Sequence, residues 1–227
     1  MAPSAVIFDF NGTVSDDEGL LAELFERIFA DAGIDVPSSL YFEEFAGYSD
    51  EEICERVLER FGRTGEPGLL EHLIEQRTTL YLEAQQLGPT VRPEAARCVR
   101  EIAARVPVAI ASGAARAEIE AVLRAAGLDG LFPVIVAMED VRNGKPDPEG
   151  YLRALELLRR QTGAELPAGQ VLVFEDSEQG LRSARAAGMP CVVIAGTASP
   201  ERLEGAAAIV SALDWSIPLI RALFDED

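Results

Sequence analysis

Acidic, hydroxyl and amino side chains follow apolar runs at four places in the sequence, three of them directly and one, Lys145, in the loop after its run. The runs are residues 5–8, 107–111, 133–138 and 170–174, and the polar residues after them are Asp9, Ser112 with Gly113, Lys145, and Glu175 with Asp176. Carboxylate oxygens are the ligands that hard divalent cations prefer, and a carboxylate can also act as a nucleophile. Hydroxyl, ammonium and backbone N–H groups bind anionic oxygens. Together these groups fit the transfer of a phosphoryl group.

The segments around these residues predict that they meet in space. The four runs, and two more at 190–196 and 206–211, are continuously apolar and rich in Val and Ile, which is typical of strands covered on both faces. Helical patterns lie between them, at 93–105, 116–127 and 177–188. Strands that alternate with helices indicate a doubly wound α/β fold with a parallel, Rossmann-like sheet. Ligands of such sheets bind beyond the carboxyl ends of the strands, where all four polar groups lie.

Residues 17–86 have a different character. They contain no convincing strand pattern, and amphipathic helical patterns recur along them. We therefore expect a Rossmann-like catalytic core formed by residues 1–16 and 87–227, with an all-helical cap inserted as residues 17–86. A cap over the edge of the sheet would exclude water and read the leaving group.

The charge balance restricts the partners of the chain. It has 39 acidic and 20 basic residues, and a formal net charge of −19. Such a surface repels nucleic acids and anionic membranes, and no apolar run is long enough to span a bilayer, so we expect neither as a partner. An anionic substrate then needs a local positive group, and Lys145 is the only lysine of the chain. We expect a small phosphorylated metabolite as the ligand of a monomer or homodimer.

The cysteines and the first residues bear on the compartment. Cys54, Cys98 and Cys191 are far apart and form no CxxC pair, which predicts reduced thiols rather than a disulfide framework. No basic region precedes the first apolar run, so the sequence predicts no signal peptide. We therefore expect a cytoplasmic protein.

Five motifs of the chain resemble those of the haloacid dehalogenase superfamily, and within it the β-phosphoglucomutase-like phosphatases with a helical cap. The motifs are DFNGT (9–13), GYSDEEI (47–53), ASG (111–113), GKPDP (144–148) and FEDSEQGLRSARAAGM (174–189). The resemblance covers essentially the whole chain, and its last two motifs are the most specific. It implies a Mg²⁺-dependent phosphoric monoester hydrolase that forms an aspartyl-phosphate intermediate.

The resemblance also implies a role for each matching residue. Asp9 would be the nucleophile, and Ser112, Gly113 and Lys145 would bind the phosphate. The metal ligands would be Asp9, Asp176, the backbone carbonyl of Asn11, and Glu175 either directly or through a water. Residues 47–53 would form the substrate loop of the cap. Arg116, which follows the ASG motif, is a further candidate for substrate binding because it could point from the core toward the cap.

Asn11 departs from the family pattern, which has an aspartate that protonates the leaving oxygen and then deprotonates the attacking water. An amide can do neither, and general acid–base catalysis is typically worth about 10²–10⁴ in rate. Asn11 could be an engineered substitution. It could also be the natural residue of an enzyme that uses substrates with good leaving groups, or a proton donor elsewhere such as Asp16, Asp17 or Glu18. The chain could also be a non-catalytic binder of a phosphorylated ligand.

Three sister reactions of the superfamily fit the sequence less well than hydrolysis. A phosphomutase depends heavily on the missing carboxyl group. A dehalogenase uses no metal, whereas residues 174–176 resemble a metal-binding motif. Phosphonate cleavage needs a lysine in the cap, and residues 17–86 contain none.

Overall fold

A six-stranded parallel sheet forms the centre of the protein in the computed structural model, which describes residues 2–225. The strands are β1 (Ala5–Phe8), β2 (Val108–Ala111), β3 (Val134–Val136), β4 (Val171–Glu175), β5 (Cys191–Ile194) and β6 (Ala208–Val210). Their order in the sheet is β3-β2-β1-β4-β5-β6, which confirms the predicted doubly wound, Rossmann-like class. All six strands overlap runs predicted from the sequence.

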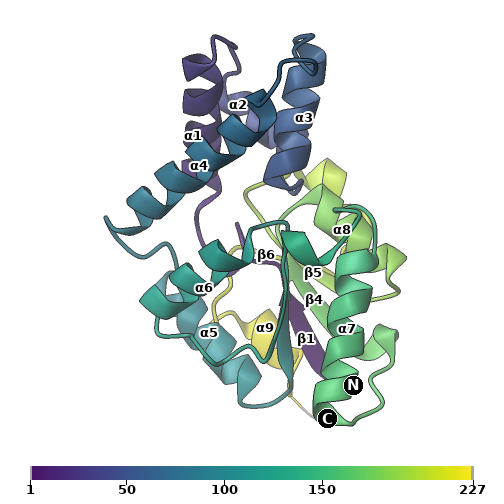
Figure 1. Ribbon diagram of the computed structural model, residues 1–227. Helices are drawn as coiled ribbons and strands as arrows, with labels where there is room; N and C mark the ends of the chain where they lie inside the picture. The colour runs from purple at the N-terminus through teal and green to yellow at the C-terminus, as the bar shows by residue number, and fades with distance from the viewer. Residues whose placement is uncertain (1, 226–227) are drawn as a thin grey trace.

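Helices cover both faces of the sheet (Figure 1). Helices α5 (Pro93–Ala103), α6 (Arg116–Ala125) and α9 (Pro218–Ala222) pack on one face, and α7 (Glu149–Thr162) and α8 (Glu178–Ala186) on the other. Strand β1 shows why the two cores are separate: Val6 and Phe8 belong to the first, and Ala5 and Ile7 to the second. Successive side chains of a strand point to opposite faces, so a strand buried on both must be apolar throughout.

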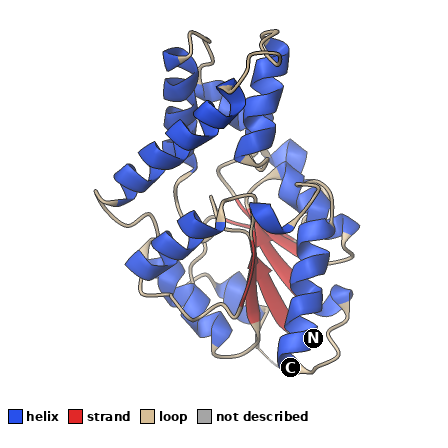
Figure 2. Cartoon of the chain, in the orientation of Figure 1, coloured by secondary structure: helices blue, strands red, loops and turns tan. Residues whose placement is uncertain are grey.

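Four helices and no strand lie between β1 and α5. They are α1 (Glu18–Asp31), α2 (Ser38–Leu40), α3 (Asp50–Arg60) and α4 (Leu69–Gln85), with a π-helical turn at Tyr41–Phe45. Figures 1 and 2 show them as a helical body, at the top of both views, above the end of the sheet. We refer to Glu18–Gln85 as the helical subdomain.

The loop before α3 and the first turn of that helix pack against the rest of the molecule. Ser49 caps α3 in a reciprocal arrangement with Glu52, whose carboxylate accepts from the Ser49 backbone N–H at 2.9 Å. Gly47 has φ +91°, and a side chain there would lie 2.5 Å from Ser177 Oγ. A side chain at Gly144 would meet the Glu52 carboxylate at 2.4 Å. Glycine at these two positions therefore lets the loop lie directly against the ends of the strands.

Two further expectations concern the thiols and the membrane. Cys54, Cys98 and Cys191 are buried and unpaired, as the sequence predicts. Within residues 2–225, no helix combines the length and the apolar character that a membrane crossing requires.

Candidate active site

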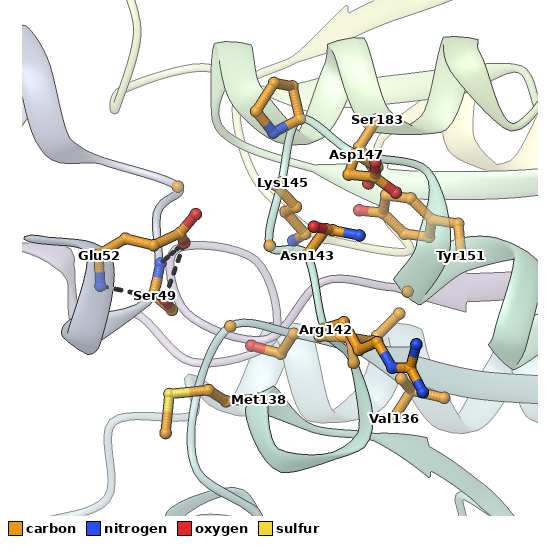
Figure 3. Close-up of a pocket in the computed structure, with 18 of the residues that line it drawn as sticks. Ser49, Glu52, Val136, Met138, Arg142, Asn143, Lys145, Asp147, Tyr151 and Ser183 are labelled. Atoms are coloured by element: carbon orange, nitrogen blue, oxygen red, sulfur yellow. Dashed lines mark hydrogen bonds between the residues drawn. The ribbon is translucent and has the colours of Figure 1, made fainter.

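The predicted chemical groups meet at the carboxyl ends of the strands, beneath the helical subdomain. A cavity of about 30 Å³ is lined on the core side by Asp9, Asn11, Ser112, Gly113, Lys145 and Asp176. A larger cleft of about 830 Å³ lies beside it and shares Ser112, Gly113 and Lys145 with it. Figure 3 shows this cleft between Ser49 and Glu52 of the helical subdomain and the loop that carries Asn143 and Lys145.

Lys145 connects the two acidic strand ends. Its ammonium group pairs with Asp9, which follows β1, and with Glu175 Oε1 at 2.6 Å, at the end of β4. It also lies 5.4 Å from the centre of the Tyr151 ring. Burial by itself would lower the pKa of Lys145, but the two carboxylates more than offset this and raise it above its usual range. Lys145 is therefore a fixed positive charge beside Asp9.

Glu175 already has a partner for each of its oxygens. Oε1 accepts from Lys145 and from the Tyr151 hydroxyl at 2.9 Å, while Oε2 accepts from the Ser177 hydroxyl and from the backbone N–H groups of residues 176 and 177, all at 2.9 Å. Burial opposes ionisation, yet Lys145 and these donors hold the pKa of Glu175 below its ordinary value. Of the two alternatives for Glu175, this arrangement fits an outer role, in which it orients Lys145 and the β4–α8 turn, better than direct contact with a metal.

Asp9 and Asp176 form, with Glu175, a group of carboxylates that could hold a divalent cation. One oxygen from each lies within 4.8 Å of the others, and all three side chains are buried. Burial raises the pKa of Asp9 to about 7, and burial with the charges of Glu18 and Glu175 raises the pKa of Asp176 well above its usual range. Such neighbours are costly to ionise together unless a cation compensates them. The all-oxygen donor set fits Mg²⁺.

Gly12 lets the turn after β1 lie against Asp176, which follows β4. It has φ +68°, and a side chain there would lie 2.0 Å from Asp176 Oδ2. Glycine adopts this left-handed conformation at no steric cost and leaves room for the carboxylate. The turn after β1 thus passes directly beside Asp176.

Ser112 and Gly113 occupy the turn after β2. The backbone N–H of Ala114 donates to Ser112 Oγ at 3.1 Å, so the hydroxyl hydrogen of Ser112 remains available to another acceptor. Both residues line the cavity with Asp9 and Lys145. The arrangement offers a hydroxyl donor and an ammonium donor on the same side of the Asp9 carboxylate.

The side chain of Asn11 donates to Asp17, and this link was not visible in the sequence. Asn11 Nδ2 lies 3.0 Å from Asp17 Oδ2, which also accepts from the hydroxyls of Ser15 at 2.7 Å and Tyr81 at 2.6 Å. Burial raises the pKa of Asp17, although these donors lower it in part. Tyr81 belongs to α4, so the group joins the helical subdomain to the turn after β1.

The three acids proposed as alternative proton donors occupy different environments. Asp16 is exposed and forms an ion pair with Arg92, so it is not part of the cavity lining. Asp17 is buried and bonded to Asn11. Glu18 lines the cavity, and burial with the charge of Asp17 raises its pKa to about 8. Of the three acids, Glu18 alone lines the cavity, whereas Asp17 is connected to it through Asn11 and Asp16 is not connected to it.

Arg116 does not reach this cavity, so the structure contradicts its predicted position. Its guanidinium donates to the backbone carbonyl of Ile135 at 2.9 Å and forms an ion pair with Asp140. Asp140 also accepts from the backbone N–H of Ala137 at 2.9 Å, which fixes it beside the end of β3. The side chain of Arg116 therefore pairs with Asp140 beside the end of β3 instead of extending toward the cavity.

A buried ion cluster next to the cavity has no counterpart in the sequence prediction. Arg77 of α4 lies 3.1 Å from Asp50 Oδ2 and 2.6 Å from both carboxylate oxygens of Glu118 on α6. The side chains of Arg77 and Glu118 are each 1% exposed. Sequence signals were weak: Arg77 lies in an ordinary amphipathic helix, and Glu118 is one of several acids near the start of another.

Known proteins are similar to this chain along most of its length. Residues 6–194 match the family described as haloacid dehalogenase-like hydrolase. Protein CbbY of Rhodobacter capsulatus is 32% identical over 229 residues, which cover 98% of this chain and 96% of CbbY. The phosphorylated carbohydrates phosphatase of Thermotoga maritima is 31% identical over 198 residues, which cover 82% of each chain.

Solved structures agree with the fold. β-Phosphoglucomutase of Clostridium difficile superposes with a TM-score of 0.83 at 19% identity, covering 99% of this chain and 97% of that chain. A mutant of CbbY from Rhodobacter sphaeroides, in complex with xylulose-(1,5)bisphosphate, superposes with a TM-score of 0.78 at 27% identity, covering 99% and 100%. The family predicted from the motifs is therefore confirmed: this chain belongs to the haloacid dehalogenase-like hydrolases.

Proposed function

We propose that the protein is a Mg²⁺-dependent phosphoric monoester hydrolase that releases phosphate from a small phosphorylated metabolite, such as a sugar phosphate, through an aspartyl-phosphate intermediate. The meeting of Asp9, Ser112 and Lys145 in one cavity, beside the buried carboxylate of Asp176, carries this proposal. The carbohydrate phosphatase of T. maritima, a relative along most of the chain, supports the substrate class.

Asp9 performs the first step. One carboxylate oxygen attacks phosphorus, and the bond from phosphorus to the ester oxygen breaks. The alcohol leaves with the bonding electrons and takes up a proton from Glu18, the acid that lines the cavity and whose raised pKa keeps it protonated. A water then attacks the phosphorus of the aspartyl phosphate, which releases inorganic phosphate and restores the carboxylate. Burial beneath the helical subdomain keeps bulk water away during the first step.

Lys145 and Ser112 hold the phosphoryl oxygens. The ammonium group has three hydrogens, of which Asp9 and Glu175 take two, so the third can bind a phosphoryl oxygen. The free hydroxyl hydrogen of Ser112 can bind another. Fixed donors of this kind stabilise the charge of the transition state without reorganising.

Asp9, Asp176 and the backbone carbonyl of Asn11 would hold the cation, with Glu175 as an outer partner. When bound, a divalent cation neutralises charge on the phosphoryl group.

The division of the chain into a core of residues 1–16 and 87–227 and a cap of residues 17–86 is part of the same proposal. The cap would move to admit substrate, because the present cavity of about 30 Å³ holds little more than one water. The buried thiols support a reducing compartment such as the cytoplasm.

A second candidate function follows from Asn11. An amide there can neither protonate the alcohol nor deprotonate the water, so a protein with the same phosphate-binding groups could retain binding and lose most turnover. This candidate is a non-catalytic binder of a phosphorylated ligand.

Release of inorganic phosphate from a panel of sugar phosphates and p-nitrophenyl phosphate, measured with Mg²⁺ and with EDTA, distinguishes the two. We expect hydrolysis that needs Mg²⁺ and is lost in Asp9→Ala. If no ester is hydrolysed, while a phosphorylated ligand raises the melting temperature, the binder is the correct description.

A further inference from the structure

The part of the cavity that faces the leaving group lacks an unpaired positive charge among the described residues. Apart from Asp9, Lys145 and Asp176 at the ends of the strands, the charged residues that line it are Glu18, Asp50 and Arg77. The ester oxygen must point toward this end, because the phosphoryl group is bound on the other side by the turns of the sheet. The charges here therefore act on the alcohol portion of the substrate.

The guanidinium of Arg77 is already neutralised. Glu118 accepts from its Nη1 through both carboxylate oxygens at 2.6 Å, and Asp50 Oδ2 lies 3.1 Å from its Nε. Two carboxylates thus face one guanidinium, and all three side chains are buried or nearly so. Whichever carboxylate carries a proton, the cluster has no net positive charge.

Opening of the helical subdomain does not free Arg77. Arg77 and Asp50 belong to the same subdomain, on α4 and at the start of α3, whereas Glu118 belongs to α6 of the core. A movement that admits substrate can separate Arg77 from Glu118, but it leaves the pair with Asp50 intact. The guanidinium is therefore matched by a carboxylate in both arrangements.

The cleft beside the cavity is also lined by more acids than cations. Helix α3 contributes Glu51, Glu52 and Glu55 to its lining, and the core adds Arg142 as the one cation besides Lys145 among the residues that line it. Figure 3 shows the Arg142 guanidinium on the side turned away from Ser49 and Glu52. An incoming ligand therefore passes a row of acids on the subdomain side.

From this arrangement we infer that the protein selects phosphomonoesters whose alcohol portion carries no negative charge, and that Asp50, by neutralising Arg77, sets this selectivity. The inference rests on the proposed function. It excludes bisphosphates and phosphorylated acids as good substrates, in contrast to the CbbY of R. sphaeroides, which was solved with xylulose-(1,5)bisphosphate. A second anionic group would enter between Glu18 and the Asp50–Arg77 pair with no free cation to bind it, so it would lose its hydration without gaining a partner.

Three phenyl phosphates that differ only in the para substituent test the inference. The substituents are hydroxymethyl, aminomethyl and carboxylate, and the reading is inorganic phosphate release with Mg²⁺. We expect kcat/KM for the neutral and cationic esters to exceed that for the carboxylate ester by at least about tenfold. Asp50→Asn leaves Arg77 with an uncompensated charge once the subdomain opens, and should raise kcat/KM for the carboxylate ester about tenfold relative to the neutral one.

Two controls make the result interpretable. Glu120→Gln changes an exposed acid on the same helix as Glu118 and should leave the ratio unchanged. Glu118→Gln removes the core partner of Arg77 but leaves the pair with Asp50, so it should change the ratio much less than Asp50→Asn does. The comparison of the three esters with the parent protein stands even if a variant folds poorly. Equal hydrolysis of all three esters, or a preference for the carboxylate ester, overturns the inference and leaves the hydrolase standing. If none of these esters, nor p-nitrophenyl phosphate, is hydrolysed, both proposals fail.

Discussion

Asn11 and Asp17 form a matched amide–carboxylate pair, with Asn11 Nδ2 3.0 Å from Asp17 Oδ2. Tyr81 Oη, Ser15 Oγ and the backbone N–H of Gly12 also donate to the Asp17 carboxylate. An aspartate at 11 would place a second buried carboxylate against Asp17. This hydrogen bonding supports the interpretation that Asn11 is the natural residue of an enzyme that works without the usual acid at this position.

The pair predicts that Asn11→Asp alone restores activity incompletely. The new carboxyl group would supply acid–base catalysis but would repel Asp17 at close range. The double variant Asn11→Asp/Asp17→Asn exchanges the two groups and keeps a hydrogen bond between them. We expect it to raise kcat for an alkyl phosphate by about 10²–10⁴, and to exceed the single variant. If the single variant is as fast as the double, the pair has no catalytic consequence.

Binding of Mg²⁺ should raise the melting temperature, because a cation compensates the buried carboxylates of Asp9 and Asp176. Differential scanning fluorimetry with and without MgCl₂ measures this directly. Asp176→Asn should abolish most of the shift, whereas Asp147→Asn, an exposed acid of the nearby loop, should retain it. A shift that survives Asp176→Asn would mean that the cation binds elsewhere.

Lys145→Ala should weaken phosphate binding and destabilise the fold together. The substitution removes a donor to the phosphoryl group and leaves Glu175 and Asp9 buried without their cation, which typically costs about 3–5 kcal/mol. Isothermal titration with inorganic phosphate and urea unfolding measure the two effects. Lys145→Arg is a useful companion, because it keeps the charge but not the compact ammonium group. Unchanged phosphate affinity in Lys145→Ala would contradict the role given to Lys145.

Glu118→Ala should lower the free energy of unfolding by about 3 kcal/mol, because it leaves the buried Arg77 with Asp50 as its remaining carboxylate partner. The matched change is Glu120→Ala on the exposed side of α6, which should stay within about 0.5 kcal/mol of the parent protein. Urea unfolding of both variants makes the comparison. Equal stabilities would show that the ion cluster contributes nothing to the fold.

The sequence predicted the strands and the polar residues at their ends better than the contacts between side chains in the site. All six strands could be found because strands buried on both faces must be continuously apolar, and their ends then mark the ligand edge of the sheet. That reasoning brought Asp9, Ser112, Lys145 and Asp176 to one place. Helix α7 was not predicted, although it supplies Tyr151 to Glu175.

The sequence did not predict the contacts between side chains that are far apart along the chain. Arg77 and Glu118 are 41 residues apart, and Asp17 and Tyr81 are 64 apart, so no local pattern pairs them. Arg116 illustrates the opposite failure. It was predicted to reach the substrate from its place after a motif, but Asp140, 24 residues further on, holds it in the core. The ion-pair partner of a long side chain depends on which segments the fold brings together, and the local sequence does not show this.

The central claim is that Asp9 forms an aspartyl-phosphate intermediate. A rapid-quench experiment with p-nitrophenyl phosphate and Mg²⁺ tests this claim. Its leaving group needs no proton, so Asp9 should be phosphorylated quickly, while Asn11 cannot activate the water and the second step should be slow. The account predicts a burst of p-nitrophenolate approaching one equivalent per chain, and phosphate on the acid-quenched peptide that contains Asp9. Steady release of inorganic phosphate with no burst and no labelled Asp9 peptide would contradict it.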